Sequence, residues 1–139
     1  MRIAHVALLC AVVAFSQLPL PAFAGDTDPL FVNATTDQPH RVKMALVFAK
    51  GQLERKHPVA IFLNDRGVLV ASKANTAQFQ EQQELLKGLM ASGATIIVCP
   101  MCMEHYGVKP DDLLAGVALG SPEVVGGALF KDSTKTMTW

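Results

Sequence analysis

The chain has 139 residues, half of them hydrophobic, and its 12 Lys and Arg balance its 12 Asp and Glu to a formal net charge of zero. This length suits one domain with a single core. The sequence has no basic stripe and no aromatic–basic interleaving, so we expect no nucleic-acid partner.

The first 24 residues have the features of a cleavable signal peptide. Arg2 supplies a positive start, residues 3–15 are almost unbroken apolar sequence, and residues 22–24 (Ala-Phe-Ala) form a small-x-small cleavage site. An apolar run of about 13 residues is too short for a stable membrane anchor, although an uncleaved tether is the alternative. We therefore predict that residues 1–24 are removed and that residues 25–139 form a periplasmic domain without membrane contact.

Three elements are predicted in the first part of this domain. A short apolar run at residues 30–33 is typical of a buried strand. Good N-cap residues precede Pro39, and apolar residues then recur at helical spacing, which predicts a helix over residues 39–54. The continuous apolar run at residues 59–63 indicates a strand buried on both faces, as in a parallel sheet.

The middle of the domain continues the alternation of strands and helices. After a polar turn, residues 68–71 are expected to form a brief strand or edge segment. Helical spacing predicts a second helix over residues 77–91, ended by Ser-Gly. Residues 95–98 are the third strand, and residues 102–107 are expected to make one helical turn.

The chain closes with one more helix and one more strand. A Ser-Pro-Glu start at residue 121 predicts a helix reaching about Phe130, and residues 136–139 alternate as a final strand would. Strands alternating with helices predict an α/β fold: a three-layer, open, mostly parallel sheet of four to five strands with helices on both faces. Residues 25–139 are thus expected to form a single α/β domain.

The two cysteines of this domain, Cys99 and Cys102, are the main candidates for chemistry. A disulfide between residues so close in sequence closes a loop of very few residues, so it removes little entropy from the unfolded state. A structural staple is therefore a poor explanation, even in the oxidising compartment that an exported protein meets. The alternative that either cysteine is a passive packing residue remains open.

Their position favours a reactive sulfur. Cys99 stands at the exit of the predicted third strand, and in open α/β sheets ligands gather beyond the carboxyl ends of the strands. A helix start there would favour a thiolate, and His105 would add a proton acceptor or a positive charge. A thiolate attacks disulfides, accepts a sulfane sulfur or binds a soft metal, and the spacing leaves all three chemistries open.

The order of these segments, and the run from Ile97 to Val108 with its Cys-Pro-Met-Cys-Met-Glu-His-Tyr-Gly sequence, resembles the DsrE/DsrF-like sulfur-relay family. The resemblance also takes in the early strand and helix, the strand at 59–63 and the ending from Gly116 to Trp139. It implies a homo-oligomer, a trimer or hexamer, in which a cysteine carries persulfide sulfur between partner proteins. The family's loop cysteine matches Cys102, and Cys99 is a second cysteine that only some relatives share.

Our leading hypothesis is a periplasmic sulfur carrier that is at most sulfurtransferase-like. In it Cys102 accepts persulfide sulfur, and Cys99 is a second thiol that resolves or modulates this persulfide. Its partners would be sulfur donor and acceptor proteins, and no cofactor is expected. The first alternative is a Cu or Zn module that uses Cys99, Cys102 and His105 as metal ligands. A thiol–disulfide redox protein comes next, and an inert structural subunit last.

Overall fold

The computed structural model describes residue 25 and residues 27–139, so the predicted signal peptide at residues 1–24 lies outside the described residues. The described chain forms a five-stranded sheet in the order β4-β3-β2-β1-β5, and every neighbouring pair is parallel. The prediction of an open parallel sheet is therefore confirmed. The strands are β1 (Leu30–Ala34), β2 (Val59–Leu63), β3 (Thr95–Val98), β4 (Ala118–Leu119) and β5 (Lys135–Thr138).

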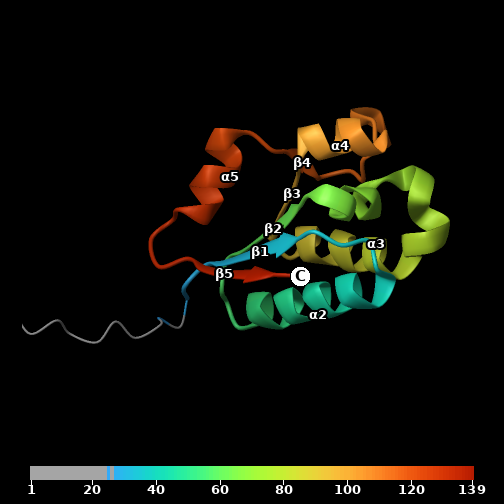
Figure 1. Cartoon of the computed structure of the whole chain (residues 1–139). Helices are drawn as coiled ribbons and strands as arrows, with labels where there is room; N and C mark the ends of the chain where they lie inside the picture. The colour runs from blue at the N-terminus through green and yellow to red at the C-terminus, as the bar shows by residue number, and fades with distance from the viewer. Residues whose placement is uncertain (1–24, 26) are drawn as a thin grey trace, which may run out of the picture.

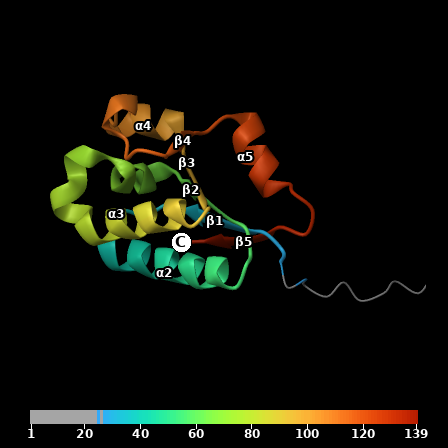
Figure 2. The same ribbon diagram turned by 180° about the vertical axis from the view of Figure 1, so that it is seen from behind.

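Helices cover both faces of the sheet, as predicted (Figure 1). In that view α2 lies below the sheet, α3 lies at the height of β1, and α4 and α5 lie above the strands; Figure 2 shows the same arrangement from behind. The α-helices are α2 (Pro39–Glu54), α3 (Thr76–Ala91), α4 (Pro100–Tyr106) and α5 (Pro122–Leu129), and the 3-10 helices are η2 (Asp65–Ala71), η3 (Lys73–Asn75) and η4 (Pro110–Asp112). No helix in the described part of the chain is both long and apolar enough to cross a bilayer.

The main core lies between the sheet and the α2–α3 layer. Helix α2 begins with Pro39, whose ring is pre-set for a first helical turn, and its buried residues recur at helical spacing. Strand β2 alternates between buried and half-buried residues, so one of its faces belongs to this core. Fully buried members of the core are Val32, Leu46, Ile61, Leu63, Leu86, Val98 and, at one per cent exposure, Phe79.

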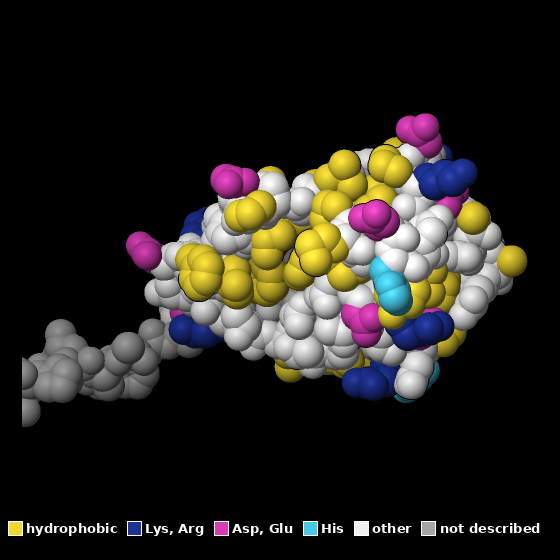
Figure 3. Space-filling model, turned by 45° about the horizontal axis from the view of Figure 1, so that its top comes forward, with side chains coloured by type: hydrophobic (Ala, Val, Ile, Leu, Met, Phe, Trp, Pro, Cys, Tyr) yellow, Lys and Arg dark blue, Asp and Glu magenta, His cyan; other side chains and the backbone are white. Residues whose placement is uncertain are grey.

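The opposite face of the sheet is less well covered. Phe31 and Ile97 are buried there but lie outside the main core cluster, and the Phe31 ring lies 6.3 Å from that of half-buried Phe62. Helix α5 has no buried residue, and Phe130 just after it is 81% exposed. Hydrophobic side chains gather across this side of the molecule in Figure 3. The chain therefore leaves an apolar surface around α5.

Residues 68–71 were predicted as a strand, and this prediction is wrong. They belong to the 3-10 helix η2, in which Val68, Val70 and Ala71 are buried. Gly67, within η2, lies so close to the carbonyl oxygen of Ala34 that a β-carbon at Gly67 would collide with it. This close approach turns the chain into a tight helix over the end of the sheet, and the apolar run fills the core from there.

The remaining differences concern element boundaries. Helix α4 starts at Pro100, two residues before the predicted turn, and strand β5 covers residues 135–138 instead of 136–139. The two-residue strand β4 was not predicted because it is too short to produce a pattern. The predicted cap of α5 is confirmed, since the Ser121 hydroxyl accepts the Val124 N–H at 3.2 Å.

Candidate functional site

Because β1, β2 and β3 are parallel and in register, the segments that follow them lie together at the carboxyl ends of the strands. Ala34 pairs with Leu63, and Leu63 pairs with Val98, so the three strands end side by side. Cys99 follows at once, and its N–H donates to the Leu63 carbonyl at 3.0 Å. The predicted location of Cys99, at the carboxyl end of the third strand, is confirmed.

The two cysteines face each other across the first turn of α4. Cys99 is the N-cap of this helix, and its sulfur accepts the N–H of Cys102 at 3.3 Å. Both cysteines are free thiols, and both are half-buried and packed against the core. The structure thus places two sulfur atoms together where a reagent can approach.

Cys102 lines an open hollow of about 400 Å³ at the carboxyl ends of the strands. Met101, which is 79% exposed, lies at its rim and extends the apolar surface outward. Met103 points the other way and is buried in the core. The lining residues are Asn64, Asp65, Met101, Cys102, His105 and Tyr106.

Burial raises the pKa of the Cys102 thiol, and the neighbouring Cys99 side chain raises it further. The backbone N–H of Asp65 acts in the opposite direction and lowers this pKa, because it stabilises negative charge on the sulfur. Partial desolvation and the neighbouring Cys99 side chain thus oppose the thiolate that we expected the helix start to favour at Cys102.

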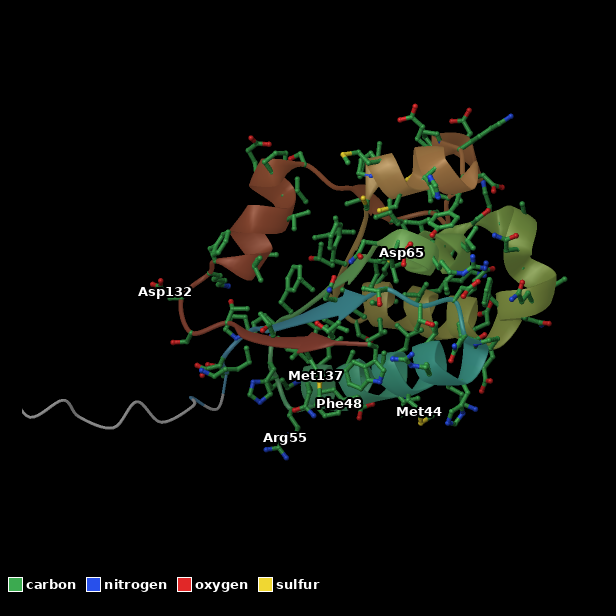
Figure 4. The ribbon with its side chains drawn as sticks, viewed as in Figure 1. Met44, Phe48, Arg55, Asp65, Asp132 and Met137 are labelled. Atoms are coloured by element: carbon green, nitrogen blue, oxygen red, sulfur yellow. The ribbon has the colours of Figure 1, made fainter. Side chains whose placement is uncertain are left out.

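Asp65 joins β2 to this hollow and was not predicted as a site residue. It is the first residue of η2, with a left-handed φ of 45°, a conformation that non-glycine residues rarely adopt. The Tyr106 hydroxyl donates to its carboxylate at 2.5 Å, and this bond raises the pKa of Tyr106. Figure 4 labels Asp65 in the region between the sheet and α4. The signal in the sequence was its position directly after a predicted strand.

Arg66 connects the hollow to the start of α2. Its guanidinium lies 2.6 Å from the Asp37 carboxylate and 5.7 Å from the centre of the Tyr106 ring. The Arg66 guanidinium lowers the pKa of Asp37, and Asp37 in turn raises that of Arg66. Because Asp37 neutralises this arginine, the Asp65 carboxylate leaves the hollow with a local excess of negative charge.

His105 lines the hollow but does not complete a metal site. Its ring packs edge-on against Tyr106, with 4.7 Å between the ring centres. Among the described residues, no group of three or more His, Cys, Asp and Glu side chains is placed to hold a metal ion. The structure therefore brings Cys99 and Cys102 together without adding His105 as a third ligand.

Comparisons with known proteins agree with the fold. The model of the DsrE/DsrF-like family matches residues 30–136. The uncharacterized protein MJ0989 of Methanocaldococcus jannaschii is 36% identical over 113 residues, which cover 78% of this chain and 98% of that protein. Two solved structures share the fold: ychN of E. coli (TM-score 0.68, 17% identity) and MTH1491 of Methanobacterium thermoautotrophicum (TM-score 0.67, 16% identity). Each alignment covers 81% of this chain and 99% of the other.

Proposed function

The chain belongs to the DsrE/DsrF-like family, and from this membership we propose that it is a thiol-based sulfur carrier of the periplasm. In this proposal Cys102 accepts a sulfane sulfur as a persulfide, and Cys99 is the neighbouring thiol that resolves or modulates it. The sulfur comes from one protein partner and passes to another. The family is associated with sulfur relay in general, and the chemistry at Cys102 is our own extension of that association to this chain.

The observation that carries the proposal is the position of Cys102. Cys102 lines an open hollow at the carboxyl ends of the strands, where a partner's sulfur-bearing side chain has room to approach. The exposed Met101 side chain beside it offers an apolar contact for such a partner.

The groups around Cys102 suit a sulfur that is loaded and unloaded. The raised pKa of Cys102 lowers its thiolate fraction, which slows its reaction with unwanted reagents. The Asp65 N–H then stabilises the negative charge that develops on the sulfur during attack. The Tyr106–Asp65 hydrogen bond fixes the turn that holds this N–H in place. Asp65 and Tyr106 thus act as positioning residues for Cys102.

Sulfur loading followed by mass measurement tests the proposal. We expect the reduced protein to gain one sulfur atom per chain from a persulfide donor such as glutathione persulfide, and to gain none when Cys102→Ser is treated in the same way. The tryptic peptide 88–131 contains Cys99 and Cys102 and no other cysteine, so it locates the added sulfur. Equal loading of wild type and Cys102→Ser would refute Cys102 as the acceptor.

Export through cleavage after residue 24 is the second part of the proposal. Gly25 would then be the first residue of the periplasmic protein, five residues before β1 begins. N-terminal sequencing of the protein from a periplasmic extract should read Gly-Asp-Thr-Asp-Pro. Recovery of the intact N-terminus in the membrane fraction would instead identify a tether.

Assembly into a trimer or hexamer is the third part. The surface around α5 supports it, since Val124 and Phe130 remain 41% and 81% exposed in the single chain. Light scattering on the purified protein should give the mass of three or six chains. A single-chain mass would contradict this part of the proposal and leave the chemistry at Cys102 untouched.

The metal-binding alternative is less well supported. Two cysteines supply only half of a tetrahedral site, and His105 does not join them in a ligand group. Copper or zinc would need ligands from a second chain or from solvent. Titration with Cu(I) under anaerobic conditions would favour this alternative only if the Cys99→Ser/Cys102→Ser double variant lost the bound metal.

A further inference from the structure

A sulfur carrier needs one acceptor sulfur, and this site holds two. Cys99 is not among the residues that line the hollow, whereas Cys102 is. The two residues are one helical turn apart, and the Cys102 N–H reaches the Cys99 sulfur at 3.3 Å. The second thiol is therefore positioned behind the first, on the side away from an approaching partner.

Resting on the proposed carrier function, we propose that Cys99 ends the loaded state by expelling the carried sulfur as hydrosulfide. The Cys99 thiolate attacks the Sγ atom of the Cys102 persulfide, and the two cysteines close into a disulfide. The protein would then have a sulfide-releasing activity in addition to its role as a carrier.

The step balances in atoms and electrons. A bond forms between the Sγ atoms of Cys99 and Cys102, and the bond between the Cys102 Sγ and the outer sulfur breaks. The outer sulfur leaves with that electron pair as hydrosulfide and is reduced, while the pair of cysteines is oxidised to the disulfide. The proton of the Cys99 thiol goes to solvent.

The geometry selects the inner sulfur as the target. The outer sulfur of a Cys102 persulfide extends into the open hollow, where a protein acceptor would meet it. The inner sulfur stays beside Cys99, because side chains three residues apart in a helical turn lie on the same face. The Cys102 N–H donates to the Cys99 sulfur at 3.3 Å, and this contact holds the Cys99 sulfur against the turn that carries Cys102.

The same arrangement sets a competition between transfer and release. An acceptor protein that docks quickly takes the outer sulfur before Cys99 reacts. Without an acceptor, the chain releases sulfide and stops as the disulfide, which cannot be loaded again. Reuse therefore requires a dithiol reductant from a periplasmic thiol–disulfide protein, and the released product requires a sulfide-consuming reaction.

The experiment follows sulfide and disulfide together. Reduced wild type and Cys99→Ser are loaded anaerobically with glutathione persulfide and freed of excess donor by desalting. Released sulfide is then measured over time, while alkylation and analysis of peptide 88–131 report thiol, persulfide or disulfide. Cys99→Ala serves as a second variant, and circular dichroism checks that both variants keep the fold.

We expect wild type to release sulfide in equal molar amount to the disulfide formed, and both Cys99 variants to keep the added sulfur without release over the same interval. Wild type that keeps its persulfide, or that forms the disulfide without sulfide, would overturn the inference. A wild type that neither takes up sulfur nor forms the disulfide would instead refute the carrier function itself, so the two failures are distinguishable. Loss of loading in the Cys99 variants alone would refute Cys102 as the acceptor and so overturn the inference.

Discussion

The two faces of the sheet differ in how completely the chain covers them. On one face, Ile61 and Leu63 are fully buried beneath α2 and α3. On the other, Phe62 of the same strand is only half-buried, and α5 above it buries none of its own residues. The first face shows what a domain of this size can stabilise alone. The second is the face on which we propose that further chains assemble, and this difference between the faces can be tested.

The largest effect is expected from a cavity in the covered face. Ile61→Ala removes three buried carbon atoms from a side chain with no exposed area, which should lower the free energy of unfolding by about 2–5 kcal/mol. Urea unfolding of diluted protein measures this loss. Val124→Ala on α5 is the control, since a 41% exposed residue should change stability by no more than about 0.5 kcal/mol. Comparable losses would show that both faces are equally well packed.

A change on the less covered face of the sheet, around α5, should affect assembly instead of folding. Phe130→Ser removes the most exposed aromatic ring near α5, and each buried copy of such a ring contributes about 1.5–3 kcal/mol to an interface. We expect light scattering to show dissociation toward single chains, with the unfolding of the single chain unchanged.

Met44→Ser provides the matched control for Phe130→Ser. Met44 is a 38% exposed side chain on α2, on the other side of the sheet, where Figure 4 labels it beside Phe48. Its replacement should leave assembly intact. Dissociation caused by Met44→Ser, with none from Phe130→Ser, would move the interface to the α2 side.

A smaller effect is expected at the start of α5. Ser121→Ala removes the hydroxyl that accepts the Val124 N–H, and the loss of such a cap costs about 1 kcal/mol. Because α5 packs weakly, the loss should appear as faster hydrogen exchange in the first turn of α5, with little change in α2. Unchanged exchange at Val124 would mean that contacts other than the cap hold this helix.

The smallest effect is expected at Asp65, beside Cys102 at the carboxyl ends of the strands. The Asp65 carboxylate contributes to the raised pKa of Cys102, so Asp65→Asn should lower that pKa and increase the thiolate fraction at neutral pH. Alkylation of Cys102 in a Cys99→Ser background should therefore become faster. Anionic iodoacetate should gain more than neutral iodoacetamide, because the variant also removes a repelling charge.

Asp111→Asn is the control for this charge effect. Asp111 is an exposed carboxylate in η4 that is not among the residues lining the Cys102 hollow. Its removal should change neither rate. Equal gains for the two reagents in Asp65→Asn would show that the pKa falls without any electrostatic selection of the reagent.

Sequence patterns were sufficient where an element buries a regular stripe. The predicted bounds of α2 and β2 agree with the structure, because helical spacing in one and a continuous apolar run in the other leave few alternatives. They were insufficient for residues 68–71, where an apolar run suits a strand and a buried 3-10 helix equally. Only the close approach of Gly67 to Ala34, a contact between distant segments, decides between them.

The same division holds at the site. The position of Cys99 and Cys102 followed from the order of elements, since the end of a parallel strand fixes the edge on which they lie. The Asp65–Tyr106 hydrogen bond joins residues 41 apart in the sequence, and no local pattern signals it. The raised pKa of Cys102 was also beyond prediction, because it depends on how much water the fold removes from around the sulfur.

The pairing of the first and last strands has a consequence for how the protein is made. Strand β1 lies between β2 and β5, and the Thr35 hydroxyl reaches the Trp139 carbonyl across a separation of 104 residues. During synthesis one side of β1 therefore stays unpaired until residues 135–138 have emerged, and such long-range pairing is slow. If the chain is exported as we propose, this delay would keep the polypeptide unfolded, and able to cross the membrane, until nearly all of it has been made.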